Sequence, residues 1–181
     1  VRKLDYSIQI SKIFYERFIN EEEITLFSPH EVPELYEAWG TPEFDELYIK
    51  AERKTSIKKT KVSAQELFFD ILKERAETGR IYIMNIDHCN THSSFKDRVY
   101  MSNLCQEITL PTDPIQHIDG EGEIALCILS AINVGKIDKR DELEELCDLA
   151  VRSLDEIIDH QKYPVMAAEI STKARRSLGI G

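Results

Sequence analysis

The chain has 181 residues, 42% of them hydrophobic and 31% charged, which is typical of a globular protein with one domain or two small ones. Its net charge of −10 argues against a general binder of nucleic acid or of anionic membranes, because those polyanions would repel it. The longest uninterrupted apolar run, Ile124 to Leu129, is far shorter than the ~18 residues that a membrane-spanning helix requires.

Residues 1–61 are predicted to be a mainly helical lead-in. Apolar side chains recur at helical spacing over 5–20, and the Ser-Pro pair at 28–29 is a helix-start signal. A further helix is expected over 41–48, which begins with Thr-Pro and carries apolar residues on one face. The stretch 50–61 is rich in Lys and Thr, so we expect it to be exposed.

The remaining two-thirds of the chain are predicted as helix, strand, loop, strand and helix. Ser63 and Glu66 form a capping box at the start of the first of these helices, and Gly79 is its expected C-terminal stop. Residues 80–86 follow as a strand with apolar residues on both faces, an order that is typical of a parallel α/β sheet. The polar residues 87–102 are numerous enough for a functional loop.

A second two-sided apolar strand is predicted over 123–134, and 141–162 is the clearest helix, with Asp141 as its expected N-cap. The tail 171–181 is basic. The sequence contains no internal repeat and no convincing domain boundary. We therefore expect 62–181 to continue from the helical lead-in as a single α/β segment.

Four cysteines are present, and none belongs to the close CxxC pairs that zinc ribbons and thioredoxin-like sites use. They are Cys89, Cys105, Cys127 and Cys147. In a chain of this length, widely spaced cysteines indicate mostly reduced thiols in a reducing compartment, so the expected location is the cytoplasm. An even number permits disulfides, but the spacing requires none.

The densest group of reactive side chains is SNLCQE at 102–107. In an extended segment, side chains two positions apart point to the same side. Asn103, Cys105 and Glu107 would then present an amide, a thiol and a carboxylate on one face, and Glu107 would act as a base toward a hydroxyl that Asn103 orients. The alternative is a partly buried cysteine between surface polar residues, and the pattern alone leaves both open.

The other cysteines and two histidines have simpler interpretations. Cys127, inside the predicted strand, and Cys147, on the apolar stripe of the last helix, are typical of core packing. His88, Cys89 and His92 follow a strand end and supply three possible zinc ligands, but no second ligand pair has suitable spacing. Polar residues that shape a loop are the favoured interpretation. The motifs GxGxxG, GxxxxGK[ST], GxSxG and HExxH are missing.

Several longer blocks, in this order, resemble the large catalytic subunit of class I ribonucleotide reductase, in its bacterial and phage form. They are ITLFSPHEVPELY (24–36), TGRIYIMNIDHCNTH (78–92), SNLCQEITLPT (102–112), GEIALCILSAIN (122–133) and RRSLGIG (175–181). The resemblance covers essentially the whole chain. It implies part of a ten-stranded α/β barrel with a central finger loop, in a subunit that reduces ribonucleoside diphosphates to 2′-deoxyribonucleotides by radical chemistry.

The resemblance also implies roles for particular residues. Cys105 matches the cysteine at the tip of the finger loop, which becomes a thiyl radical and abstracts hydrogen from the 3′ carbon of the ribose. Glu107 matches the carboxylate that takes the proton of the 3′ hydroxyl, and Asn103 matches the amide that hydrogen-bonds the substrate hydroxyls. Cys127 matches one member of the redox-active cysteine pair, a role that its surroundings in the sequence do not indicate.

The same resemblance implies partners. They are the remainder of the large subunit, a small radical-generating subunit, and thioredoxin or glutaredoxin as reductant. No cofactor is expected in this chain, because the metal centre belongs to the small subunit. Tyr82 and Arg80 are expected near the radical route. The second redox cysteine is expected before Val1 and the relay tyrosines beyond Gly181, so the isolated chain is expected to show no turnover.

Two alternatives stay open beside this interpretation. The first is a non-catalytic structural or assembly piece of a split or truncated subunit. The second is an unrelated enzyme with a cysteine nucleophile. In the second case Cys105 would be paired with His88 or His92.

Overall fold

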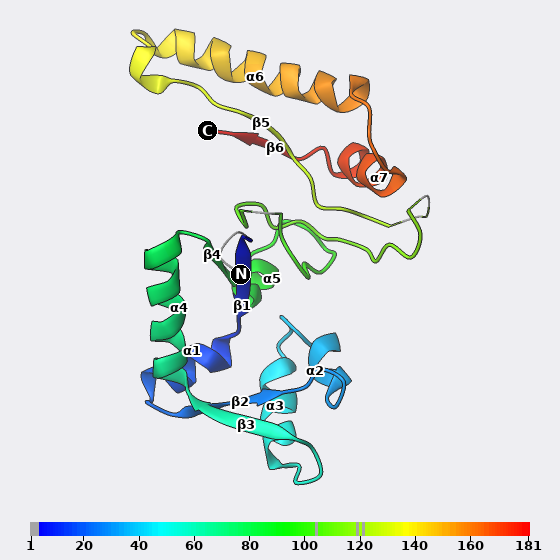
Figure 1. Ribbon diagram of the computed structural model, residues 1–181. Coiled ribbons are helices and arrows are strands. Elements are labelled where there is room, and N and C mark those ends of the chain that lie inside the picture. Colours follow the sequence, from blue (N-terminus) through cyan, green and yellow to red (C-terminus); the bar gives the residue numbers. More distant parts are fainter. Residues whose placement is uncertain (1–3, 104, 119, 121) are drawn as a thin grey trace. The chain divides into compact units, whose positions relative to one another are not determined.

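The computed structural model describes residues 4–103, 105–118, 120 and 122–181 (Figure 1). It divides into two compact units, Val1–Thr109 and Leu110–Gly181, where the sequence showed no boundary. Leu104, inside the SNLCQE group, and the chain start at Val1 lie outside the described residues. No helix in the described ranges is long and apolar enough to cross a membrane.

The first unit is organised around two parallel strands, β1 (Tyr6–Ile10) and β4 (Ile81–Asn85), which pair from Tyr6 with Ile81 to Ile10 with Asn85. The prediction of one helix over 5–20 is therefore wrong in its first half, and only α1 (Lys12–Ile19) is helical. The segment YSIQI alternates apolar and polar residues as well as fitting a helical period, and the pairing with β4 decides between them. The parallel sense agrees with the α/β pattern of the sequence.

A second pair of strands, β2 (Glu23–Phe27) and β3 (Lys59–Ser63), runs antiparallel. The exposed stretch expected over 50–61 thus ends in a strand. Its polar sequence, KTKVS, does not predict a strand. Val62 is partly buried and packs against the core, whereas the preceding two residues face solvent.

Two helices connect these strands, α2 (Pro33–Glu37) and α3 (Phe44–Arg53). The first begins at Pro33 rather than near Ser28, since a proline is favoured in the first turn, where its missing N–H is not needed. The helix predicted over 41–48 is confirmed as α3, and its apolar face is buried through Phe44 and Tyr48.

Helix α4 (Ala64–Thr78) confirms the predicted capping signals. The Ser63 hydroxyl accepts a hydrogen bond of 3.3 Å from the backbone N–H of Glu66. At the other end Gly79 adopts a left-handed conformation, with φ 67°, and closes the helix. Ala64 is fully buried, so the beginning of α4 is packed into the core of this unit.

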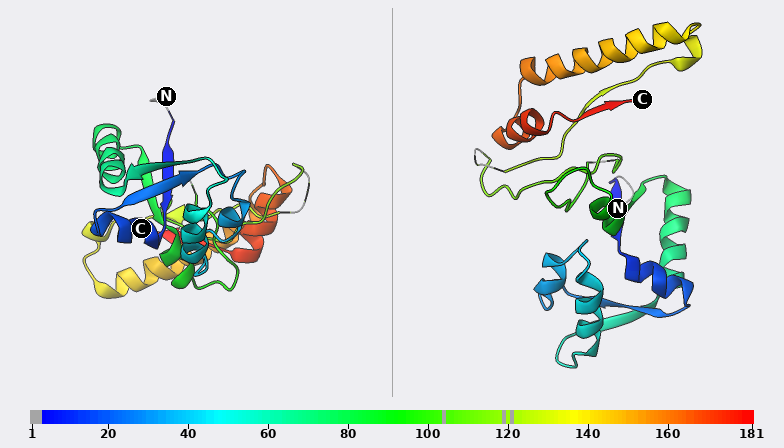
Figure 2. Two further views of the ribbon diagram at one scale, coloured as in Figure 1. Left: turned by 90° about the horizontal axis from the view of Figure 1, so that it is seen from below. Right: turned by 180° about the vertical axis from the view of Figure 1, so that it is seen from behind.

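The core of the first unit lies between the strands and helices α1, α3 and α4 (Figures 1 and 2). Aromatic rings contribute much of its contact: Phe68 of α4 lies 6.0 Å from Phe14 and 5.1 Å from Phe18 of α1, measured between ring centroids. The fully or nearly buried members are Ile10, Ile13, Phe14, Ile24, Val32, Leu35, Ala38, Phe44, Tyr48, Ala51 and Ala64.

After β4, the chain forms the short helix α5 (Ile86–Thr91) in the range that was predicted as loop. The fully buried Ile86 and Val99 pack together with Met84, which alone in β4 is buried. The prediction of a strand buried on both faces over 80–86 is therefore only partly correct, and the strand ends at Asn85.

The second unit contains a short parallel pair, β5 (Ile128–Ser130) with β6 (Leu178–Ile180), and two helices. The strand predicted over 123–134 is thus three residues long and partly exposed. A 3₁₀ turn (Val134–Lys136) follows β5, and the basic tail forms the second half of α7 (Met166–Arg175) and then β6.

Helix α6 (Arg140–His160) confirms the clearest helix prediction and runs alongside the β5–β6 pair (Figure 2). It begins after Lys139 without a side-chain cap, so the prediction of Asp141 as N-cap is wrong. Only Leu154 and Ile158 of its apolar stripe are buried, because the two strands beneath it are short.

Arg176 joins α7 and β6 to α6. It follows α7 in a left-handed conformation, with φ 45°, and its guanidinium contacts the carboxylates of Asp155 at 2.7 Å and Asp159 at 3.0 Å. This contact holds the pKa of Asp159 below its ordinary value. Nearby, Arg175 pairs at 2.5 Å with Glu123, and both side chains are largely buried.

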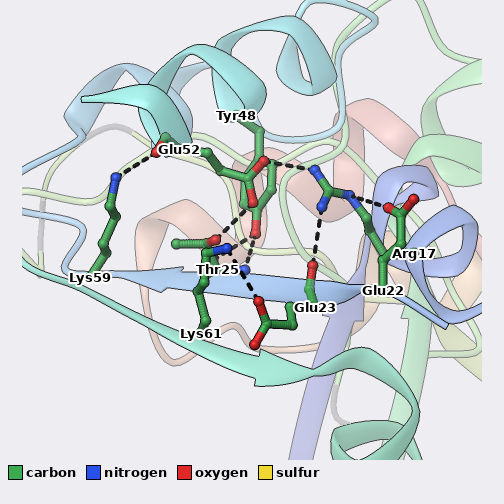
Figure 3. A network of polar contacts seen from close by, with 8 residues as sticks. All are labelled: Arg17, Glu22, Glu23, Thr25, Tyr48, Glu52, Lys59 and Lys61. Carbon is green, nitrogen blue, oxygen red and sulfur yellow. Dashed lines mark hydrogen bonds and ion pairs between the residues drawn. The ribbon is translucent and has the colours of Figure 1, made fainter. Parts of the chain in front are cut away.

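A network of polar contacts fixes β2 against α1 and α3 (Figure 3). The Tyr48 hydroxyl donates to the carbonyl of Thr25 at 2.7 Å and accepts from its N–H at 2.6 Å. The Thr25 hydroxyl donates to Glu52 at 2.7 Å, and the other Glu52 oxygen pairs with Arg17 at 2.7 Å. Figure 3 shows these residues with Glu22, Glu23, Lys59 and Lys61. The buried backbone groups of Thr25 therefore depend on one phenol.

We predict that Tyr48→Phe lowers the free energy of unfolding by about 1–3 kcal/mol, because it leaves both backbone groups of Thr25 buried without that partner. Burial raises the pKa of Tyr48 to about 12, whereas a tyrosine in the unfolded chain ionises near pH 10. The stabilisation is therefore complete below pH ~10 and is lost as the pH rises toward 12.

Urea unfolding followed between pH 8 and 12 checks this, with Tyr36→Phe as control, because Tyr36 is 74% exposed. Equal stability losses in the two variants, or the same alkaline loss in Tyr48→Phe as in the unchanged protein, would contradict it.

Candidate functional site

The segment that carries the candidate site forms a tight turn. The carbonyl of Asn103 accepts a 3.2 Å hydrogen bond from the N–H of Gln106, and Gln106 adopts a left-handed conformation, with φ 60°. The prediction of an extended segment with alternate side chains on one face is therefore wrong. Cys105 lies at the exposed tip of the turn.

The turn nevertheless brings the predicted amide and carboxylate together. The side-chain N–H of Asn103 donates to Glu107 at 2.6 Å, and the Asn103 oxygen accepts from the N–H of Ile108 at 3.2 Å. Ser102 donates to the carbonyl of Ile108 and so closes the base of the turn. We call residues 102–108 the cysteine loop. Ser102 was not among the predicted site residues, although it directly precedes Asn103 in the sequence.

This arrangement leaves the groups of the loop accessible. Cys105 and Glu107 are exposed, and Asn103 is partly exposed. The bond from Asn103 occupies one lone pair of the carboxylate, and an ionised carboxylate has about four, so Glu107 retains acceptor capacity for a ligand hydroxyl. The loop can therefore present a thiol, an amide and a proton acceptor to one small polar molecule.

Tyr82 of β4 is the neighbour of the Cys105 thiol. The negative charge of the cysteine sulfur, and then its hydrogen bond to the phenol, raise the pKa of Tyr82 above its ordinary value. Only the family resemblance had indicated that Tyr82 lies near the radical route.

Cys127 belongs to the second unit, where it directly precedes β5 and is partly exposed. Gly179 of β6 lies beside it: a Cβ at Gly179 would be 3.9 Å from the Cys127 sulfur and 2.6 Å from a methyl group of Leu129. The core-packing interpretation of Cys127 is therefore too simple, because the residue is partly exposed and borders a glycine.

The remaining cysteines differ from each other. Cys147 is exposed, so the prediction that it packs in the core is wrong, since only the later part of the α6 stripe is buried. Cys89 is partly buried beside Ile86 and Val99, and burial raises the pKa of its thiol.

His88 of α5 and His92, which directly follows that helix, have ring centroids 5.7 Å apart. His92 Nδ1 lies 3.0 Å from the Thr91 hydroxyl and 3.3 Å from the His88 carbonyl. Within the described residues neither imidazole contacts Cys105, and no group of three or more His, Cys, Asp or Glu side chains is arranged to hold a metal. A cysteine–histidine nucleophile therefore receives no support from the contacts.

Comparison with known proteins gives one consistent result. The family described as "Ribonucleotide reductase, barrel domain" matches residues 1–181. The chain is 59% identical to the ribonucleoside-diphosphate reductase subunit alpha of Haemophilus influenzae, 54% identical to that of reductase 1 of Escherichia coli, and 41% identical to that of enterobacteria phage T4. Each match covers 100% of this chain and 25% of the relative, so the chain spans about a quarter of the length of these proteins.

We predict that Cys105→Ser returns the pKa of Tyr82 toward its ordinary value, because the serine carries no negative charge at alkaline pH. The measurement is phenolate absorbance against pH, in which each protein is compared with its own Tyr82→Phe variant to isolate the Tyr82 signal. If Tyr82 ionises at the same pH with cysteine and with serine, the contact between the two side chains is absent.

Proposed function

The chain belongs to the ribonucleotide reductase barrel domain family, and from this premise we propose that it forms part of a catalytic subunit that reduces ribonucleoside diphosphates to 2′-deoxyribonucleoside diphosphates for DNA synthesis. The observation that carries the proposal is the cysteine loop. It exposes Cys105 at its tip, next to the hydrogen-bonded pair of Asn103 and Glu107.

Each group in the loop has a place in this chemistry. In our proposal the Cys105 thiyl radical takes a hydrogen atom from the 3′ carbon of the ribose, so an S–H bond forms and a C–H bond breaks. Glu107 accepts the proton of the 3′ hydroxyl, while Asn103 hydrogen-bonds the sugar hydroxyls. The contact between Asn103 and Glu107 supports this assignment, because it holds the two polar groups where one sugar can meet both.

The reduction also needs two electrons. We propose that Cys127 is one of two thiols that supply them and that become a disulfide, while the 2′ hydroxyl leaves as water and the 3′ hydrogen atom returns from Cys105. The partial exposure of Cys127 beside Gly179 supports this role, because a partner sulfur has to reach it.

For the fold, we propose that the two units contribute strands to a ten-stranded α/β barrel. In support, both β1–β4 and β5–β6 are parallel pairs. A parallel sheet of two strands is incomplete by itself, since such sheets are normally larger and covered on both faces.

We further propose partners from the names of the relatives, which are alpha subunits. A small subunit would generate the radical at its own metal centre, so this chain would hold no cofactor, and thioredoxin or glutaredoxin would reduce the disulfide again. The four cysteines are free thiols, which supports a reducing compartment such as the cytoplasm.

The test uses a hybrid subunit, in which this chain replaces the matching segment of the Escherichia coli relative. We predict that the hybrid subunit, combined with the small subunit of that enzyme, forms deoxynucleotides, and that Cys105→Ser reduces turnover to background while substrate still binds. Serine keeps the size of the side chain but cannot form the thiyl radical.

The matched control is Cys147→Ser, which changes an exposed cysteine in α6 and should leave turnover unaffected. Deoxynucleotide formation that persists in Cys105→Ser would overturn the proposed role of the cysteine loop.

A further inference from the structure

The three residues Arg98, Val99 and Tyr100 lead into the cysteine loop, and we call them the loop stem. Each is bound to a different part of the first unit. We propose that Asn90 of α5 is a positioning residue that fixes this stem and thereby sets where Cys105 lies. The inference rests on the proposed function, and it adds a residue outside the loop to the reductase site.

Asn90 binds Val99 through both of its backbone groups. The N–H of Val99 donates to Asn90 Oδ1 at 2.8 Å, and Asn90 Nδ2 donates to the carbonyl of Val99 at 3.0 Å. The second N–H of the amide donates to the Ile86 carbonyl at 3.2 Å, which fixes the side chain on its own helix. The Asn90 amide therefore binds the backbone N–H and C=O of Val99 as a neighbouring strand would, and the Val99 side chain is fully buried.

Arg98 and Tyr100 are held on either side of that contact. The Arg98 guanidinium donates to the carbonyl of Glu37 at 2.7 Å and to that of Trp39, and it lies 4.4 Å from the centre of the Tyr100 ring. Gln9 of β1 donates to the Tyr100 carbonyl at 2.8 Å and accepts from the Trp39 indole at 2.5 Å. The stem is thus attached to β1, to α5, to the last residue of α2 and to the segment that follows it.

Gly40 keeps the space that the Asn90 amide occupies. A Cβ at Gly40 would lie 2.8 Å from Asn90 Nδ2 and 2.6 Å from Ile86 Cγ1, and the φ of 75° also favours glycine. The absence of a side chain at Gly40 therefore lets the backbone there approach α5 closely at Asn90.

The cysteine loop depends on the stem for its placement. Apart from the contact of Cys105 with Tyr82, its own bonds, from Ser102 to Ile108 and from Asn103 to Glu107, are internal and fix its shape rather than its position. A thiol that must reach one carbon of a sugar is sensitive to displacement, and an error of about 1 Å can cost about 100-fold in rate. Asn90 acts through the backbone of Val99, so its loss should shift Cys105 without removing any group that touches the substrate.

The experiment compares Asn90→Ala with Thr91→Ala in the hybrid subunit. Thr91 is exposed on the same helix, and its hydroxyl donates to the carbonyl of Asp87 within that helix. In Asn90→Ala we expect amide hydrogen exchange of peptides covering 98–109 to become about tenfold faster or more, because two hydrogen bonds to Val99 are lost. Exchange in α4 should stay within error of that of Thr91→Ala.

For turnover, we expect kcat of Asn90→Ala to fall about 10- to 100-fold with KM for the ribonucleoside diphosphate unchanged. Asn90→Asp keeps the oxygen that accepts from Val99 but loses the donors. Its exchange over 98–109 and its kcat should therefore lie between those of the unsubstituted hybrid subunit and those of Asn90→Ala. Asn90→Asp also serves if Asn90→Ala does not fold.

Unchanged exchange over 98–109, exchange that rises equally in α4, or an unchanged kcat would each overturn the positioning role. A hybrid subunit that makes no deoxynucleotide even without substitutions would instead count against the proposed function, while the exchange experiment would still report on the contact between Asn90 and Val99.

Discussion

The parallel pairing of β1 with β4 is the constraint on which the first unit depends. It joins segments far apart in the sequence, so α1, β2, α2, α3, β3 and α4 must all form the connection between them. The pairing also places the start of α1 beside α5, where the N–H of Lys12 donates to Asp87 at 2.5 Å. Ser11 makes no side-chain cap there, and this carboxylate from the other strand end takes its place at the positive end of the helix.

The same pair of strands positions the candidate site. Gln9 of β1 holds the Tyr100 carbonyl, Tyr82 of β4 contacts Cys105, and α5, which follows β4 directly, supplies Asn90. Of the stem residues Val99 is buried, Arg98 is partly buried and Tyr100 is exposed, and together they support an exposed loop. This division suits a reactive cysteine, because the residues around it must stay open to substrate while its position is set by contacts outside the loop.

Features with a local cause could be predicted from the sequence, whereas those with a distant cause could not. Helix α4 was predicted with its ends, because Ser63, Glu66 and Gly79 act within a few residues of each other. Strand β1 was taken for helix, since its alternation becomes decisive only when β4 is present. The residue types of the site were evident at 102–107, but the turn was not, because nothing in the sequence marks Gln106 for a left-handed conformation. Asn90 lies in the polar range 87–102 that was predicted as a loop, and its role comes from a contact with Val99.

In the proposed function, the cysteine loop meets the sugar of a ribonucleoside diphosphate. The most direct measurement is an experimental structure of the hybrid subunit with that substrate bound. We expect the Cys105 sulfur in van der Waals contact with the 3′ carbon of the ribose, and the side chains of Asn103 and Glu107 hydrogen-bonded to its hydroxyls. A nucleotide bound with its ribose away from Cys105, or with the Asn103–Glu107 pair facing the base or the phosphates, would contradict the account.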